Sequence, residues 1–187
     1  FKAFIPSGPD RDTTVERLYP TFGHHVKGGF MSHLAGKLFV RTGLGDDRNK
    51  PTFKIHNVFL GKQMNPGETE LDDVALCHCH AKSWEDWRAA LRFRHARGSY
   101  RAELAPSRPR DKGGMTLHEL LSEIEAHGGE TGLRAFYDEL CAATPRLTGA
   151  LRAEGLLREC NLQLAARRRK HFPNFTGSVS IHETKLA

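Results

Sequence analysis

The spacing of apolar residues changes part-way along the chain, and this change constrains the fold more than any other feature. Residues 30–60 contain short apolar runs that are typical of strands, and a further run lies at 74–81. From residue 83 onward, leucines and aromatic residues recur every three or four positions, as in helices. The sequence therefore predicts strands followed by helices, an α+β arrangement for this stretch of chain.

Capping residues mark where the helices begin. Ser83, with Asp86 three residues later, predicts the start of a helix that runs to about Arg97. Thr116 and Glu119 have the spacing of a capping box at the start of a second helix. Gly128 and Gly129 then end that helix. A further helix follows, with Leu133, Phe136, Tyr137 and Leu140 on one face, and Pro145 opens the next one. The strands are predicted at 37–41, 53–60 and 74–81.

A segment rich in proline, glycine and arginine separates the two halves and is predicted to be a linker. We expect a first domain over residues 1–104 and this linker over 105–115. A helical appendage over 116–171 and an irregular tail over 172–187 follow. No apolar run reaches the ~18 residues that a membrane-spanning helix needs, and four cysteines are too few for a disulfide scaffold. We therefore expect a cytoplasmic protein, and the sequence leaves its oligomeric state open.

One segment carries most of the positive charge. The chain has a net charge of +6, and the nine basic and four acidic residues between Lys82 and Lys112 account for +5 of it. Such a concentration of charge favours anionic partners, namely nucleotide phosphates, nucleic acid or anionic lipid.

Two histidines alternate with two cysteines in Cys77-His78-Cys79-His80. On a strand, His78 and His80 would share one face, roughly 6–7 Å apart at their bases. Two imidazoles at this spacing can bind one metal ion, or one can bind while the other orients it. The alternative is a pair of partly exposed histidines at the end of a strand, hydrogen-bonded to their neighbours.

The helix that follows is basic on several faces and has an apolar stripe of Trp84, Trp87 and Leu91. A stripe at helical spacing indicates core packing more often than a stacking platform. Its arginines either form a solvated face or bind phosphate oxygens, which guanidinium groups match bidentately.

Upstream, residues 24–29 (His-His-Val-Lys-Gly-Gly) combine histidine, lysine and glycine. Glycines allow the backbone to approach a ligand closely. The segment lacks the spacing of a Walker A loop or of a dinucleotide-binding fingerprint. A turn with surface histidines is the alternative interpretation.

Four segments in order carry a resemblance to a known family: 36–41 (Gly-Lys-Leu-Phe-Val-Arg), 55–57 (Ile-His-Asn), 76–84 (Leu-Cys-His-Cys-His-Ala-Lys-Ser-Trp) and 97–100 (Arg-Gly-Ser-Tyr). Together they resemble the C-terminal half of bacterial family-2-like glycosyltransferases of the GT-A type, which occur in cell-surface polysaccharide biosynthesis. The resemblance covers roughly residues 1–112. It implies an α/β fold, or α+β if the chain is a fragment, with the C-terminal part of a GT-A-like mixed sheet followed here by a helical appendage.

The resemblance also implies a nucleotide-sugar donor, a saccharide or other hydroxyl acceptor, and a divalent metal, Mn²⁺ or Mg²⁺. The histidine that completes the metal's ligands in the family matches His78, with His80 as the second choice. Residues near the donor diphosphate match Lys82, Arg94 and Arg97. Residues on the acceptor side match Lys37, Arg41 and His56. No catalytic base is assigned. Because the family's Asp-x-Asp metal motif is not found here, we expect this portion alone to be inactive.

Two other functions stay open at this stage. The basic segment 82–112 would suit a nucleic-acid-binding module. Against this, its tryptophans lie on the apolar stripe rather than among the basic residues. We therefore do not expect nucleic acid as a partner. Residues 116–165 would suit a non-catalytic interaction domain that binds a partner through apolar helix faces.

Overall fold

The computed structural model describes residues 1–5, 7–31, 36–46, 49–69, 71, 74 and 76–174. Contacts between residues divide the chain into two compact units. The larger unit is Lys2–Leu157, and the smaller one combines Phe1 with the residues from Arg158 onward. The predicted linker at 105–115 therefore falls within the larger unit, and the division that the contacts give comes after Leu157.

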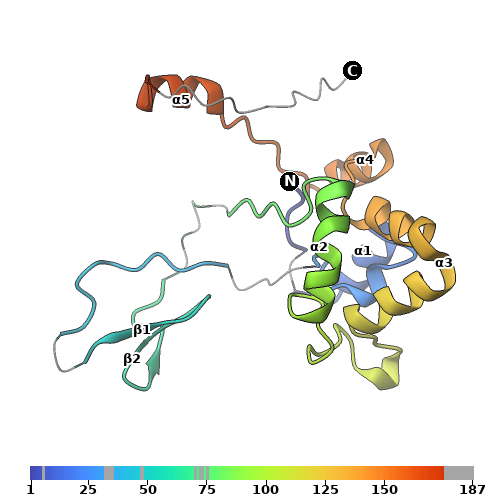
Figure 1. Ribbon diagram of the computed structural model, residues 1–187, viewed down its shortest axis with the longest axis horizontal. Coiled ribbons are helices and arrows are strands. Elements are labelled where there is room, and N and C mark those ends of the chain that lie inside the picture. The colour runs from blue at the N-terminus through green and yellow to red at the C-terminus, as the bar shows by residue number, and fades with distance from the viewer. Residues whose placement is uncertain are drawn as a thin grey trace. The chain divides into compact units, whose positions relative to one another are not determined.

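The described residues contain both helices and a small antiparallel sheet, so the secondary structure is of the α+β kind (Figure 1). The helices and 3₁₀ turns of the larger unit are α1 (Arg11–Leu18), η1 (Gly23–His25), α2 (Trp84–Ala96), η2 (Arg110–Lys112), α3 (Leu117–Leu140) and α4 (Pro145–Ala153). The strands are β1 (Pro51–Phe53), β2 (Val58–Leu60) and β3 (Gln63–Met64). The smaller unit contains α5 (Leu164–His171). None of the helices in the described ranges is both long and apolar enough to cross a membrane.

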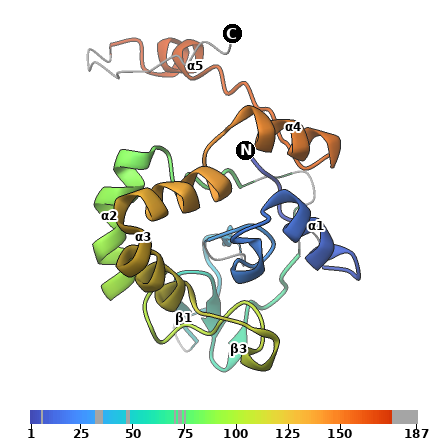
Figure 2. The ribbon, with the colours of Figure 1, turned by 90° about the vertical axis from the view of Figure 1, so that its right-hand side faces the viewer.

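Helices α1 to α4 share one hydrophobic core with residues between Ile5 and Met31. Helix α2 lies along α3 in both views (Figures 1 and 2), and its Trp87 is completely buried. The Trp87 ring packs against Phe136 of α3, with ring centroids 5.9 Å apart. The tryptophan stripe of α2 therefore belongs to the core, as its helical spacing predicts.

The helix starts predicted at Ser83 and Thr116 are confirmed, and a local hydrogen bond fixes each of them. The Ser83 hydroxyl accepts from the Asp86 amide at 3.0 Å, which starts α2. Thr116 and Glu119 form a complete capping box at the start of α3. The glycine pair interrupts the helix as predicted: Gly129 has φ 54° and ψ −143°, which is not helical, and α3 consists of two helical stretches that meet at a kink there.

The predicted strands at 37–41 and 74–81 are wrong. The backbone of 36–41 forms no strand, and neither do residues 74 and 76–81. In the second segment the His80 amide donates to the carbonyl of His78 at 3.1 Å, a tight turn that takes the chain out of the extended conformation. The alternation of cysteine and histidine over residues 77–80 resembles the pattern of a strand, although the backbone turns at this point.

The single strand predicted at 53–60 is a hairpin instead. The Lys54 amide donates to the Asn57 carbonyl at 2.7 Å, which closes a turn between β1 and β2. The two strands pair antiparallel with Phe53 opposite Val58, and β3 pairs with the other edge of β2. Polar residues in the middle of the apolar run, His56 and Asn57, lie within the turn.

We expect Thr116→Ala to lower the free energy of unfolding by about 1 kcal/mol, because it removes the acceptor of the Glu119 amide at the start of α3. Chemical denaturation monitored by circular dichroism measures this change. Thr131→Ala, the same substitution at an exposed position inside α3, is the matched control, with an expected change within about 0.5 kcal/mol. Equal effects of the two substitutions would contradict the role of the capping box.

Candidate functional site

The hydroxyl of Tyr100 joins α2 to the segment that carries the paired histidines. It accepts a hydrogen bond from Trp87 Nε1 at 3.1 Å and lies 2.7 Å from Nε2 of His80. The side chains of Trp87 and Tyr100 are completely buried. We call His80, Trp87, Arg94 and Tyr100 the Tyr100 cluster.

A sharp turn after α2 brings Tyr100 back against the helix. The Tyr100 amide donates to the carbonyl of Arg94 at 3.0 Å, and the Gly98 amide donates to the same oxygen at 3.1 Å. A side chain at position 98 would place its Cβ 2.7 Å from the Cα of Arg94. The turn therefore requires glycine because the backbone passes so close to the helix.

Arg94 is the basic residue of α2 that reaches the histidine segment. Its Nη2 donates to the carbonyl of His80 at 2.8 Å, and its guanidinium carbon lies 5.9 Å from the centre of the Tyr100 ring. Its other amino group, Nη1, is buried and has no hydrogen-bond partner within the described part of the chain. A buried donor without a partner is costly, and an anionic oxygen would satisfy it.

His80 is uncharged at neutral pH. Burial, reinforced by the positive charge of Arg94 and by neighbouring His78 and Lys2, lowers the pKa of His80 to about 4. Burial likewise raises the pKa of Tyr100 to about 12, so the hydroxyl keeps its proton. Within the Tyr100 cluster, His80, Tyr100 and Trp87 therefore form a neutral hydrogen-bonded chain, and the guanidinium of Arg94 carries the positive charge.

Two tautomers of His80 satisfy this chain. In one, the Tyr100 O–H donates to Nε2, and Nδ1 carries the ring hydrogen. In the other, Nε2–H donates to the Tyr100 oxygen, which leaves the lone pair of Nδ1 open. The second tautomer is the one that metal-ligating histidines adopt, since their outer nitrogen donates to a fixed acceptor.

His78 has a different environment. Its side chain is exposed, and its ring centroid lies 5.6 Å from that of His80. Cys77 and Cys79 are also exposed. The histidine pair thus stays close without the strand that was expected to align it.

The described residues do not complete a metal site. Within residues 76–174 and the earlier described segments, no three histidine, cysteine or carboxylate side chains are grouped so that they could hold an ion. A divalent metal needs more ligands than the two imidazoles of His78 and His80 provide.

The structure brings together only part of the predicted site. Arg94 contacts His80, whereas Lys82 and Arg97 are exposed at the two ends of α2. On the predicted acceptor side, Lys37 and Arg41 are exposed, and Nδ1 of His56 lies 2.8 Å from the carbonyl oxygen of Gly36.

Sequence reasoning missed two half-buried groups near the cluster, Lys2 and Cys141. The ammonium group of Lys2 donates to the carbonyl oxygens of Gly29 and Leu140, and burial lowers the pKa of Lys2 to about 8. Burial also raises the pKa of Cys141 to about 11. No local pattern around either residue signals this, because the partners are far away in the sequence.

We expect acid to destabilise the protein through His80. The unfolded ring takes up a proton near its ordinary pKa, and the folded ring does so only near pH 4, so the free energy of unfolding falls as pH drops from about 6.5 to about 4. His80→Gln, which keeps a polar partner for Tyr100, should flatten this fall by on the order of 1–3 kcal/mol. Urea unfolding at several pH values measures it, with His171→Gln in exposed α5 as control. An unchanged pH dependence in His80→Gln would refute the assignment.

Comparison with known proteins adds no relative to this picture. No family model, no curated protein and no solved structure matches the chain. The resemblance to glycosyltransferases therefore stays a prediction from the sequence, and function has to be argued from the Tyr100 cluster itself.

Proposed function

We propose that this chain is the C-terminal portion of a metal-dependent glycosyltransferase, and that Arg94 binds the diphosphate of the nucleotide-sugar donor. The observation that supports it best is the state of the Arg94 guanidinium. One amino group is fixed on the carbonyl of His80 at 2.8 Å, and the other is buried without a partner in the described residues. No carboxylate of the described residues forms an ion pair with Arg94, and a guanidinium that is held in place and uncompensated is suited to a phosphate oxygen.

The charge around Arg94 fits this role. His80 and Tyr100 are neutral at physiological pH, so neither supplies a negative charge that would compensate the guanidinium. In glycosyl transfer, the acceptor hydroxyl attacks the anomeric carbon and the nucleoside diphosphate leaves with the bonding electrons. A preorganised cation near the leaving oxygen stabilises the developing charge. Lys82 and Arg97 would add positive charge at the ends of α2.

A divalent cation, Mn²⁺ or Mg²⁺, is part of the proposal. His80 is the better candidate ligand of the pair because Tyr100 orients its ring, and His78 would be the second ligand. Since the described residues supply no third ligand, the others would be oxygen atoms of the diphosphate or further protein groups. When bound, such an ion neutralises the charge of the leaving diphosphate.

A GT-A fold of the whole enzyme and an acceptor side that includes Lys37, Arg41 and His56 complete the proposal. Both are implied by the resemblance of the four sequence segments. Among the alternatives, stacking of nucleic-acid bases on α2 is disfavoured, because Trp87 is buried and Trp84 packs over it with ring centroids 5.6 Å apart.

We expect Arg94→Gln to weaken binding of pyrophosphate, measured by isothermal titration calorimetry with Mn²⁺ present, by about tenfold or more, because a charge-assisted hydrogen bond is lost. Arg92→Gln, which removes an exposed charge from the same helix, is the matched control and should change the affinity less than threefold.

A melting curve for each variant separates loss of binding from loss of folding. Arg94→Lys, which keeps the charge and loses the planar pair of donors, should bind with intermediate affinity. Equal affinities of the Arg94→Gln and Arg92→Gln variants, in folded protein, would refute the proposed role of Arg94.

A further inference from the structure

The helix of the smaller unit, α5 (Figure 1), carries four consecutive basic residues, Arg167 to Lys170. Between Arg158 and Asn174 the sequence contains five basic residues and a single acidic one, so this stretch has a net charge of +4. None of the side chains of α5 is buried. The basic run thus lies on an exposed helix and is not part of a packed core.

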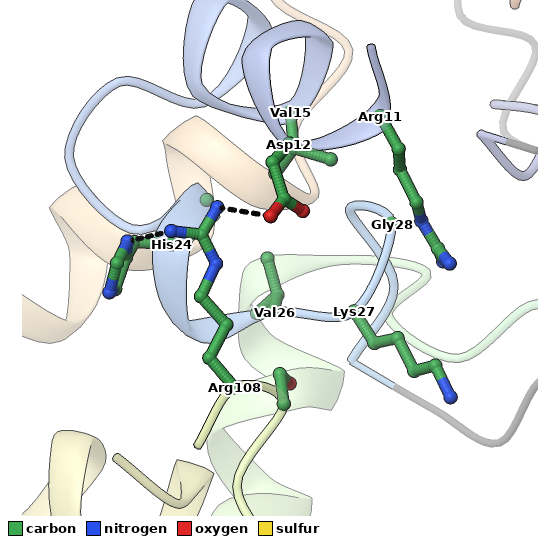
Figure 3. Close-up of a pocket in the computed structure, with 10 residues that line it drawn as sticks. Arg11, Asp12, Val15, His24, Val26, Lys27, Gly28 and Arg108 are labelled. Atoms are coloured by element: carbon green, nitrogen blue, oxygen red, sulfur yellow. Dashed lines mark hydrogen bonds and ion pairs between the residues drawn. The ribbon is translucent and has the colours of Figure 1, made fainter. Parts of the chain in front are cut away.

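A basic side chain in this protein can be neutralised within the fold, as Arg108 of the larger unit is. Its guanidinium lies 3.4 Å from a carboxylate oxygen of Asp12 and donates to Nδ1 of His24 (Figure 3). Three of the four cations of α5 have no such partner, because they form no ion pair with any residue in the described ranges. These three are Arg167, Arg169 and Lys170. Their charges are therefore available to an external anion.

The helix α5 has little support of its own. Its eight residues are fewer than the ~12–15 that an isolated helix needs in water even with a favourable sequence. Its N-cap, Gln163, has φ +47° and makes no side-chain hydrogen bond to the first turn. Arg167 and Lys170 are like charges three residues apart, which are neighbours on a helix. A surface that neutralises these charges would therefore stabilise the helix.

Large apolar side chains lie exposed on both sides of the basic run. Leu162 and Leu164 precede it and are 44% and 61% exposed, and Phe172 follows the helix directly and is 66% exposed. An anionic membrane offers phosphate groups to the cations and hydrocarbon to the apolar side chains. Nucleic acid offers phosphates too, but it provides little apolar area for two leucines. The combination of charge and apolar side chains thus favours a lipid surface.

We propose that α5 and the residues that flank it bind the surface of a membrane that contains anionic lipids. The helix lies in the interface and does not cross the bilayer. Its arginines and Lys170 contact the headgroups, while Leu162, Leu164 and Phe172 insert toward the acyl chains. This inference does not depend on the proposed glycosyltransferase function, and it uses no residue of the Tyr100 cluster.

The test is co-sedimentation of the full chain with vesicles of phosphatidylcholine alone and with vesicles in which about one third of the lipid is phosphatidylglycerol. We expect binding to the anionic vesicles only, and weaker binding as the salt concentration rises. The triple variant Arg167→Gln, Arg169→Gln and Lys170→Gln should weaken this binding by about fiftyfold or more, because each cation near an anionic surface strengthens binding several-fold.

The matched control removes three exposed cations of the larger unit, by Lys50→Gln, Lys62→Gln and Arg92→Gln, and so lowers the net charge of the chain equally. It should weaken binding by less than about fivefold. Leu164→Ala should weaken binding by about fivefold, whereas Leu71→Ala, at a leucine that is 52% exposed, should leave it unchanged. All the substituted side chains are exposed, and a melting curve of each variant checks that it folds.

The proposal is overturned if the chain binds neither kind of vesicle or binds both equally well. It is also overturned if the α5 triple variant and the control triple variant bind anionic vesicles with the same affinity. A labelled RNA duplex is titrated in parallel. If the chain binds the duplex and not the vesicles, and the α5 triple variant loses that binding, the partner of α5 is nucleic acid and not a membrane.

Discussion

The buried hydroxyl of Tyr100 is the contact on which the arrangement of the candidate site depends. It satisfies the indole N–H of Trp87 within the core and meets the ring of His80 at the edge of that core. Without it, the indole N–H would be buried and unpaired, and the histidine segment would lose its side-chain hydrogen bond to the turn that follows α2. Arg94 then adds a second connection through the His80 carbonyl. Packing and candidate chemistry are thus built from the same few groups.

Features that depend on neighbouring residues could be predicted from the sequence. The caps at Ser83 and Thr116 are formed by residues three positions away, so the starts of α2 and α3 could be located correctly. The strands could not, because pairing depends on a distant partner and on turns such as Lys54–Asn57. The central position of Tyr100 was equally hidden, since its hydroxyl meets residues 13 and 20 positions earlier.

Positive charge in this protein is divided into places where it is neutralised and places where it is not. Arg108, near the C-terminal end of the basic segment, pairs with Glu16, Asp12 and His24 and so contributes to the packing of the fold. Arg94 retains a buried amino group without a partner in the described residues. The total charge of the segment between Lys82 and Lys112 therefore says less about ligands than the pairing of individual guanidinium groups does.

The turn at Gly98 makes this site sensitive to a single methyl group. A Cβ at that position would meet the backbone of Arg94 at 2.7 Å, and backbone cannot move aside as a flexible side chain can. Relief would come from lifting the turn off the helix, which would carry Tyr100 out of reach of both Trp87 and His80. A substitution of Gly98 would therefore first break the hydrogen bond between Tyr100 and His80, and only a larger change would separate the helices.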